Sequence, residues 1–165
     1  MHSALTIRAK GLLKVLQSKV KIYPSGQKGN TEIIGVWDTG ATNTAITKKV
    51  VDNLELIPSG KTLVNTAAGT TIQNTYTIDI KLPNGVLITG ITANEAVLGT
   101  ECDSLIGMDV INMGDFAISN HKGETCMSFR TPSGHEIDYV KNLTYGMTPI
   151  KNPPKIKNKY TNKRR

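Results

Sequence analysis

One carboxylate of this sequence stands where a charge is costly to bury. Asp38 follows the apolar pair Val36-Trp37, and Thr39, Gly40 and Ala41 come directly after it. An aspartate at the end of a buried strand costs several kcal/mol unless another group pairs with it. A surface turn is the alternative, because Asp and Gly are both common turn residues. The tripeptide alone does not show whether Asp38 lies in a surface turn or is a reactive acid.

Two further stretches could position such an acid. Leu105-Ile106-Gly107 is a second apolar segment that ends in glycine, and it precedes a short predicted helix for which Asp109 is the expected N-cap. Between the two motifs lies a predicted hairpin with small residues at its tip, which suits a loop that moves or approaches a ligand closely. The remaining aspartates stand in contexts typical of caps, turns and solvated faces: Asp52, Asp79, Asp103, Asp109, Asp115 and Asp138.

Short strands account for most of the remaining pattern, and the sequence predicts an all-β fold with two short helices. Strands over Leu13–Tyr23 and Thr31–Trp37 would form the hairpin that delivers Asp38, and residues 1–12 predict no element. Thr47 is expected to cap a helix over Lys48–Leu54. The later expected strands are Tyr76–Leu82 and Val86–Ala93 around Asn84-Gly85, then Phe116–Ser119, Thr125–Phe129 and Ile137–Val140.

The net charge of +7 belongs to the end of the chain. Residues 141–165 hold eight Lys and Arg and no acid, which leaves 12 basic and 13 acidic residues before them. We expect a basic, disordered tail, and a nucleic-acid role for it is not favoured because interleaved aromatic residues are scarce. No stretch has the length of a membrane span, and no secretory leader is evident, which predicts a cytoplasmic protein.

Neither a metal nor a cofactor is expected. Cys102 and Cys126 form no CxxC pair, and His2, His121 and His135 are scattered, so the spacing of a zinc site is lacking. Two buried free thiols are the simplest interpretation.

The ordered set of motifs resembles the retropepsin-like aspartic proteases, in particular their bacterial and phage single-domain members. The resemblance rests on Asp38-Thr39-Gly40-Ala41, the small-residue hairpin, the string Leu105–Asp109 with Gly114–Ile118, and the last hairpin. It implies a retropepsin-like acid protease fold, a closed β-barrel, in a single lobe that dimerises. It also implies an N-terminal extension (1–15), a protease domain (16–140) and a tail (141–165).

The resemblance assigns a role to each matching residue. Asp38 would be the catalytic carboxylate, and Thr39 would lock the two active loops across a dimer. Gly40 would offer its carbonyl to the substrate main chain, and Ala41 would leave room beside the scissile bond. Substrate would also meet Thr42 and Asn43, which stand where viral enzymes place acids. The tip of the flexible flap would be Ala67, Ala68, Gly69 and Thr70, and the active loop would rest on Leu105, Ile106 and Gly107.

A single Asp-Thr-Gly predicts a homodimer. Peptide hydrolysis by this route needs two carboxylates that share one proton, and no second Asp-Thr-Gly or Asp-Ser-Gly exists in the chain. A symmetric dimer would bring the second Asp38 to the two-fold axis. The segments Leu13–Leu16 and Ile137–Val140 are the candidates for a shared interface sheet.

The favoured function is therefore an aspartic endopeptidase that cuts an extended polypeptide. The alternative is a catalytically weak or inactive peptide-binding or regulatory module on the same fold, for which the neutral Thr42 and Asn43 leave room. A nucleic-acid binder acting through the tail ranks last.

Overall fold

The computed structural model describes residues 2–66, 69–99 and 101–144. The chain forms two units, Met1–Gly134 and His135–Arg165. In the first unit the strands are β1 (Ser3–Lys10), β2 (Gln17–Pro24), β3 (Thr31–Trp37), β4 (Ala45–Ile46), β5 (Gly60–Thr66), β6 (Gly69–Lys81), β7 (Leu87–Glu95), β8 (Ser104–Ile106), β9 (Asp115–Ser119) and β10 (Glu124–Thr131). The helices are α1 (Lys48–Asn53), α2 (Met108–Ile111) and the 3-10 turn η1 (His121–Gly123), with α3 (Tyr139–Thr144) in the second unit.

Six strands close into a barrel. The sheet runs in the order β2-β3-β8-β4-β7-β6-β5, and β2 also pairs with β6, so the first six strands form a ring. Lys21–Pro24 of β2 pair with Ile78–Lys81 of β6 and make this closing ladder. The predicted all-β class with a closed barrel and few short helices is confirmed.

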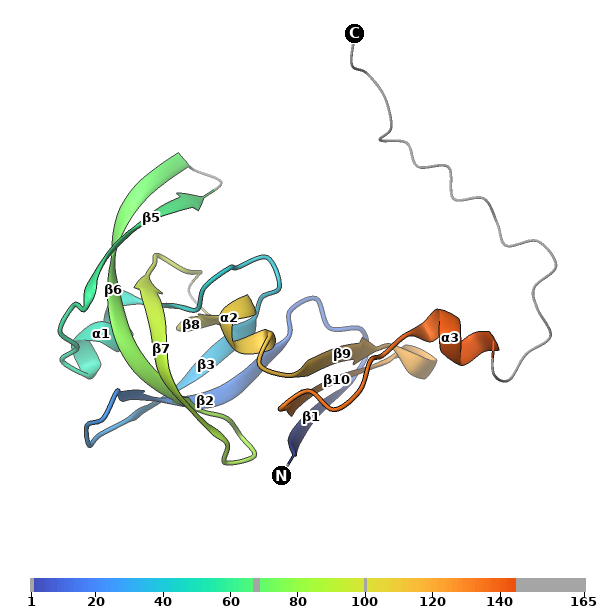
Figure 1. The fold of residues 1–165 in the computed structure, drawn as a ribbon. Coiled ribbons are helices and arrows are strands. Elements are labelled where there is room, and N and C mark those ends of the chain that lie inside the picture. Colours follow the sequence, from blue (N-terminus) through green and yellow to red (C-terminus); the bar gives the residue numbers. More distant parts are fainter. Residues whose placement is uncertain (1, 67–68, 100, 145–165) are drawn as a thin grey trace, which may run out of the picture. The chain divides into compact units, whose positions relative to one another are not determined.

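The strands β5 and β6 form a hairpin arm that reaches past the barrel (Figure 1). The residues at the far end of β6 are exposed from Gly69 to Ile72, whereas Tyr76 and Ile78 on the same strand are buried. We call this pair of strands the flap hairpin. Its last described pair is Thr66 opposite Gly69, and the predicted tip residues Ala67 and Ala68 lie outside the described residues.

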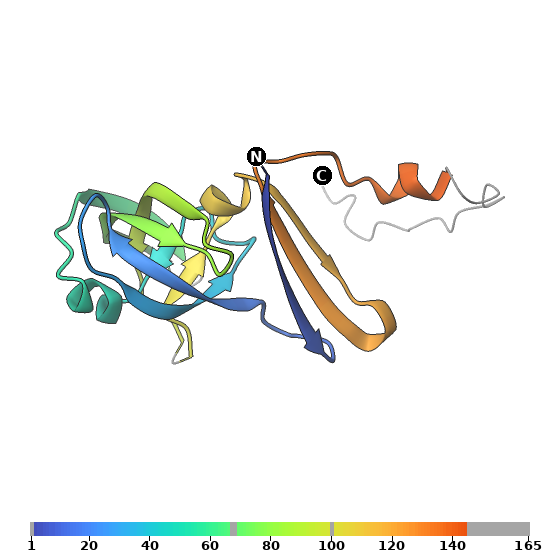
Figure 2. The same cartoon turned by 90° about the horizontal axis from the view of Figure 1, so that it is seen from below.

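The three remaining strands make a second sheet, in the order β1-β10-β9, which Figure 2 shows as three neighbouring strands. Its inward residues Leu5, Met127 and Phe129 are at most 7% exposed and join the same core as the barrel residues. Two aromatic contacts link the sheets. Trp37 of β3 stacks on Phe116 of β9, with ring centroids 5.7 Å apart, and lies 5.1 Å from Phe129 of β10. The second sheet is therefore packed against β3, the strand that leads to Asp38.

Several predicted elements agree with the structure. The β2–β3 hairpin delivers Asp38, the turn at Asn84-Gly85 joins β6 to β7, and β9 and β10 form the last hairpin. The backbone of Gly85 has a φ of +85°, the left-handed conformation that this turn requires of glycine. Helix α1 begins after Thr47, although the Thr47 side chain makes no capping hydrogen bond.

Other predictions of local structure are wrong. Residues 3–10 form a strand, and its partner β10 lies more than one hundred residues away in the sequence. The expected strand over Ile137–Val140 is absent, because Tyr139 begins helix α3, and Leu13–Leu16 form no strand either. Neither segment is therefore available as a preformed strand for an interface sheet. The boundaries drawn at residues 15 and 140 stay predictions, and residues 145–165 of the expected tail lie outside the described residues.

Candidate active site

Asp38 comes one residue after the end of β3, at a half-buried position. Its backbone N–H donates to the carbonyl oxygen of Ile106 (3.0 Å), which continues the parallel pairing of β3 with β8. The Gly40 N–H donates to the Asp38 Oδ1 atom at 2.8 Å, and the Ala41 N–H closes a turn on the Asp38 carbonyl. This backbone donor fixes the direction of the carboxylate.

The loop after Asp38 rests on the start of α2. The Met108 N–H donates to the Ala41 carbonyl at 2.8 Å, and the Asp109 N–H donates to the Thr42 carbonyl at 3.2 Å. Gly107 allows this close approach, since a Cβ atom there would lie 2.5 Å from the backbone carbon of Asn43. The glycine predicted to support the active loop therefore contacts its backbone directly.

Asp109 holds the end of the same loop. Its Oδ2 accepts the Thr44 N–H (2.9 Å), and its Oδ1 accepts the Thr44 hydroxyl (2.8 Å) and the Val110 N–H (2.9 Å). Thr44 is fully buried. The N-cap of α2 is Gly107 rather than Asp109, so the predicted capping role is wrong. Asp109 instead binds a loop that lies sixty-five residues earlier in the sequence.

Trp37, the residue before Asp38, is held in place through both its side chain and its backbone. Its side chain is 4% exposed, and its indole N–H donates to the buried Ser18 hydroxyl at 3.0 Å. Its backbone N–H donates to the Leu16 carbonyl. With Trp37 held inward, the next side chain along an extended chain is directed to the opposite face.

Asp38 lines a cleft of about 1180 Å³. The opposite wall comes from the flap hairpin, and a third side comes from the end of β7 and the residues after it. The lining residues are Asp38, Gly40, Ala41, Thr42, Asn43, Ala45, Lys48, Thr62, Leu63, Val64, Thr71, Gln73, Asn94, Glu95, Ala96, Val97, Leu98 and Leu105. A polypeptide in this cleft would lie between the Asp38 loop and the flap hairpin.

Most of the predicted site residues lie at this cleft. Gly40, Ala41, Thr42 and Asn43 line it beside Asp38, and so does Leu105. Ile106 and Gly107 lie beneath the loop and are buried. Thr39 is exposed. Gly69 and Thr70 are exposed residues near the hairpin tip, whereas the lining residues contributed by β6 are Thr71 and Gln73.

The sequence interpretation missed the wall formed by β7 and α1. Glu95 and Lys48 bring charge into the cleft, and the hydroxyl of the buried Tyr76 donates to the Glu95 Oε2 atom at 2.7 Å. Burial, together with the neighbouring carboxylate, raises the pKa of Tyr76, so the hydroxyl remains a donor. The polar pair Asn94-Glu95 at the end of an apolar strand is the signal that could have indicated this wall.

The two thiols are free, as expected, but they are half-buried rather than buried. Burial raises the pKa of Cys102, which donates to the Ser104 carbonyl at 3.0 Å. Within residues 2–66, 69–99 and 101–144, no cluster of three or more His, Cys, Asp or Glu could hold a metal ion. No helix in the same ranges has the length and apolar character to cross a membrane.

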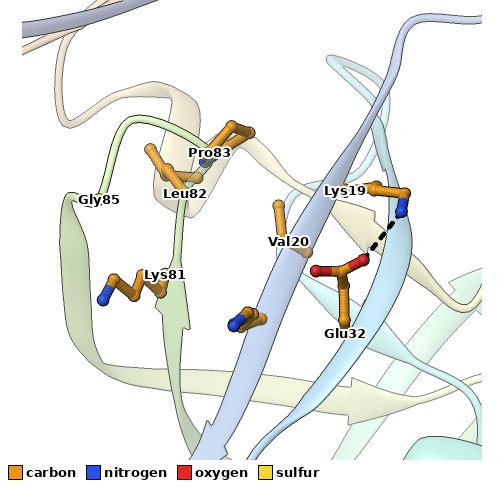
Figure 3. Close-up of a pocket in the computed structure, with 8 residues that line it drawn as sticks. Lys19, Val20, Glu32, Lys81, Leu82, Pro83 and Gly85 are labelled. Carbon is orange, nitrogen blue, oxygen red and sulfur yellow. Dashed lines mark hydrogen bonds and ion pairs between the residues drawn. The ribbon is translucent and has the colours of Figure 1, made fainter.

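A second hollow, of about 360 Å³, shares no lining residue with the Asp38 cleft. Its lining includes Lys19, Lys81 and Glu32 together with Val20, Leu82 and Pro83, all labelled in Figure 3. The Lys19 ammonium bonds Glu32 at 2.9 Å and lowers the pKa of that carboxyl. Since Glu32 is the acid among its lining residues and is already ion-paired, this hollow offers no acid–base pair for hydrolysis.

Comparison with known proteins places the chain in a family. Residues 26–113 match the family model described as gag-polyprotein putative aspartyl protease. These residues make up more than half of the chain and include the Asp38 loop, the flap hairpin and α2. No curated protein matches the sequence.

Several solved structures are similar in fold. A retropepsin-like aspartic protease from Rickettsia conorii has 14% sequence identity and a TM-score of 0.49, over 79% of this chain and 95% of that one. The EIAV protease complexed with the inhibitor HBY-793 has 19% identity and a TM-score of 0.46, over 61% and 88%. The simian foamy virus protease has 20% identity and a TM-score of 0.42, over 58% and 90%.

Proposed function

The chain belongs to the gag-polyprotein aspartyl protease family, as its resemblance to retropepsin-like enzymes predicted, and we propose that it hydrolyses peptide bonds of an extended polypeptide. The observation that carries this proposal is the position of Asp38. Its half-buried carboxylate is oriented by the Gly40 N–H and lines a cleft whose opposite wall is a hairpin. A carboxylate in this position can reach a polypeptide held between the loop and the hairpin.

The active site would be completed by a second copy of the chain. The first unit supplies one Asp-Thr-Gly, and the reaction needs two acids. In a symmetric dimer the two Asp38 carboxylates would lie side by side and could not both ionise, since like charges at about 3 Å repel too strongly. The pair would titrate as a unit, with one proton shared between them.

The chemistry then follows from the two protonation states. The ionised Asp38 removes a proton from a bound water as the water oxygen attacks the peptide carbonyl carbon. The protonated Asp38 donates its proton to the carbonyl oxygen, which gives a neutral tetrahedral intermediate. In the breakdown of that intermediate the C–N bond breaks, and the Asp38 that took the water proton gives it to the leaving amine. A hydroxyl of the intermediate returns its proton to the other Asp38, which yields the carboxylic acid and restores the one shared proton. The extended substrate would add its backbone to the flap hairpin and the Gly40 loop, as a β-strand adds to a sheet.

Asp38→Asn is the direct test. The variant should lose peptide cleavage while its unfolding transition stays close to that of the wild type, because the amide oxygen can still accept the Gly40 N–H. Asp138→Asn is a matched control, since it removes the same charge in the second unit. Cleavage by Asp38→Asn at the wild-type rate would refute the proposal.

Mixing the two proteins tests the shared site. If each active site needs two intact chains, equal amounts of wild type and Asp38→Asn that exchange subunits should retain about half of the wild-type activity. Independent sites in each chain would retain all of it. Sedimentation at the assay concentration should show the dimer, and a cleaving monomer would contradict this arrangement.

The peptide-binding alternative has its own signature in the same assays. Thr42 and Asn43 are neutral and line the cleft, so they offer hydrogen bonds without charge. A non-catalytic module would bind extended peptides with equal affinity in wild type and Asp38→Asn and release no product from either.

A further inference from the structure

The charged residues of the cleft suggest what its substrates carry. Among the lining residues three are charged, namely Asp38, Lys48 and Glu95. We propose that Glu95 is a specificity residue that binds a basic side chain, lysine or arginine, of the substrate polypeptide. This inference rests on the proposed function, and it adds the class of substrate that the same cleft selects.

The fold holds Glu95 firmly in the wall of the cleft. It is the last residue of β7 and lies opposite Ile46 of β4 in a parallel pair. The next residue, Ala96, donates its N–H to the Ile46 carbonyl at 2.9 Å. The Asn94 N–H donates to the Thr44 carbonyl at 3.0 Å, so the backbone is tied to the same segment that follows the Asp38 loop.

The Glu95 side chain is oriented by a neutral donor. Tyr76 is 3% exposed, and its hydroxyl donates to the Glu95 Oε2 atom at 2.7 Å. An ionised carboxylate accepts about four hydrogen bonds, so one hydroxyl leaves most of its capacity to a ligand. A hydroxyl also brings no positive charge, so it does not form an ion pair with this half-buried carboxylate.

The cation in the cleft is already committed elsewhere. Lys48 donates to the Asp52 carboxylate at 2.8 Å across one turn of α1, and this contact is the main cause of its raised pKa. Glu95 contributes to that shift only as a smaller, through-space effect. The lining of the cleft therefore has two carboxylates and one lysine, and that lysine is already paired with Asp52. A cationic side chain of the substrate would offset the remaining negative charge.

The geometry suits lysine and arginine in different ways. An ammonium can add a charge-assisted hydrogen bond to the carboxylate, and a guanidinium can add two parallel ones. Because Glu95 is half-buried, such a pair is screened less than a surface ion pair. Charged pairs that are partly shielded at interfaces change affinity by roughly 10-fold or more, and we expect an effect of the same size on kcat/KM here.

The experiment is a positional peptide library cleaved by the full chain. One residue at a time is set to Lys, Arg, Gln or Glu, and kcat/KM is measured for wild type, Glu95→Gln and Glu95→Lys. At one position the wild type should prefer Lys and Arg over Gln by roughly 10-fold. Glu95→Gln should lose that preference, so that its kcat/KM for the Lys and Arg peptides is no higher than for the Gln peptide, and Glu95→Lys should favour the Glu peptide.

Two controls separate recognition from a structural defect. Glu124→Gln removes an equal charge at an exposed position of β10 and should keep the wild-type preference. Glu95→Asp retains the charge and should retain a reduced preference for basic side chains. A structural defect would lower cleavage of every peptide by the same factor, whereas loss of a recognition site lowers it for the basic peptides relative to the Gln peptide.

The outcomes also distinguish this inference from the proposed function. If the wild type cleaves nothing, the endopeptidase proposal fails, and binding of the same labelled peptides is then measured by fluorescence anisotropy. Tighter binding of basic peptides to Asp38→Asn than to the Asp38→Asn, Glu95→Gln double variant would still support the Glu95 site. An unchanged basic preference in Glu95→Gln, or no basic preference at any position in either assay, would overturn it.

Discussion

Replacing Asp109 by asparagine tests the bonds that hold the Asp38 loop onto α2. The two Asp109 oxygens accept three hydrogen bonds, one at Oδ2 from the Thr44 N–H and two at Oδ1 from the Thr44 hydroxyl and the Val110 N–H. Asparagine offers one oxygen and one NH₂ group. Whichever way the amide is turned, its NH₂ faces at least one N–H donor, so at least one bond is lost.

The expected cost follows from the burial of Thr44. A hydrogen bond to a charged acceptor contributes about 1.5–3 kcal/mol, and a buried N–H without a partner costs a similar amount. The two free energies are not added, because both describe the loss of the acceptor at the same donor. Thr44 is 0% exposed, so water cannot replace the lost acceptor without a movement of the loop. We expect Asp109→Asn to lower the free energy of unfolding by about 2–3 kcal/mol.

The assay uses the one tryptophan of the chain, which is Trp37. It is buried next to the Asp38 loop, so its fluorescence in a urea titration reports on the part of the fold that Asp109 holds. The control is Asp52→Asn, which breaks an exposed ion pair on α1 and should change stability by about 0.5 kcal/mol or less. Peptidase activity should fall in Asp109→Asn, since the loop that orients Asp38 is loosened.

A double-mutant cycle with Thr44→Val isolates the contact. Valine removes the hydroxyl donor and keeps the backbone N–H, so part of the loss in Asp109→Asn should be shared with it. The combined loss should be smaller than the sum of the single losses by about 1 kcal/mol. Strict additivity, or an Asp109→Asn protein within about 0.5 kcal/mol of the wild type, would refute the argument that Asp109 locks this loop.

The remaining predictions concern the support beneath the site and the far end of the second sheet. Gly107→Ala should lower the free energy of unfolding by about 2 kcal/mol or more and abolish cleavage, because its Cβ would lie within 2.8 Å of Asn43 and Thr44 backbone atoms. The control is Gly99→Ala, whose Cβ would meet no atom within 4 Å. Equal stability of the two variants in a urea titration would contradict this prediction. The Ser133 hydroxyl, the Gly134 N–H and the Arg130 guanidinium hold the pKa of Asp115 well below its usual range, so the unfolded chain binds the proton more readily and acid destabilises the native state. Urea titrations from about pH 5 to pH 2 should show a smaller loss of stability in Asp115→Asn than in the wild type, and parallel losses would exclude Asp115 as the cause.

The parts of the site that sequence reasoning predicted are those encoded by neighbouring residues. Alternation predicts the hairpin that leads to Asp38, and many short β-branched stretches predict the all-β class. For both, the signal lies within about ten residues, the range over which hydrophobic periodicity is informative. The closed barrel and the place of Leu105-Ile106-Gly107 beneath the loop came instead from the family resemblance, and the Asp38 N–H that donates to the Ile106 carbonyl agrees with that placement.

The parts that sequence reasoning missed depend on long-range pairing. Strand β1 pairs with β10, more than one hundred residues away in the sequence. Leu5, Ile7 and Ala9 alternate with polar residues, but such a local pattern does not identify a distant partner. Glu95 and Lys48 reach the cleft because β4 pairs with β7 and is followed by α1, an arrangement that no local pattern indicates. Asp109 was expected to cap its own helix, whereas the fold uses it to bind a loop from the other motif. Ile137–Val140 shows the opposite error, in which β-branched residues suggested a strand where Tyr139 begins a helix.

Trp37 explains why the carboxylate of the next residue must face the cleft. The burial pattern of β3 alternates, with Ile33, Gly35 and Trp37 inward, and Trp37 is the residue that packs against Phe116 and Phe129 of the second sheet. A slip of one residue would move the indole towards the cleft and the Asp38 carboxylate into the aromatic core, where it would have no partner. Both consequences are unfavourable, so the large aromatic side chain fixes the register of the strand that carries the acid. The second sheet therefore contributes to the site without touching the cleft, because it provides the surface against which Trp37 is held.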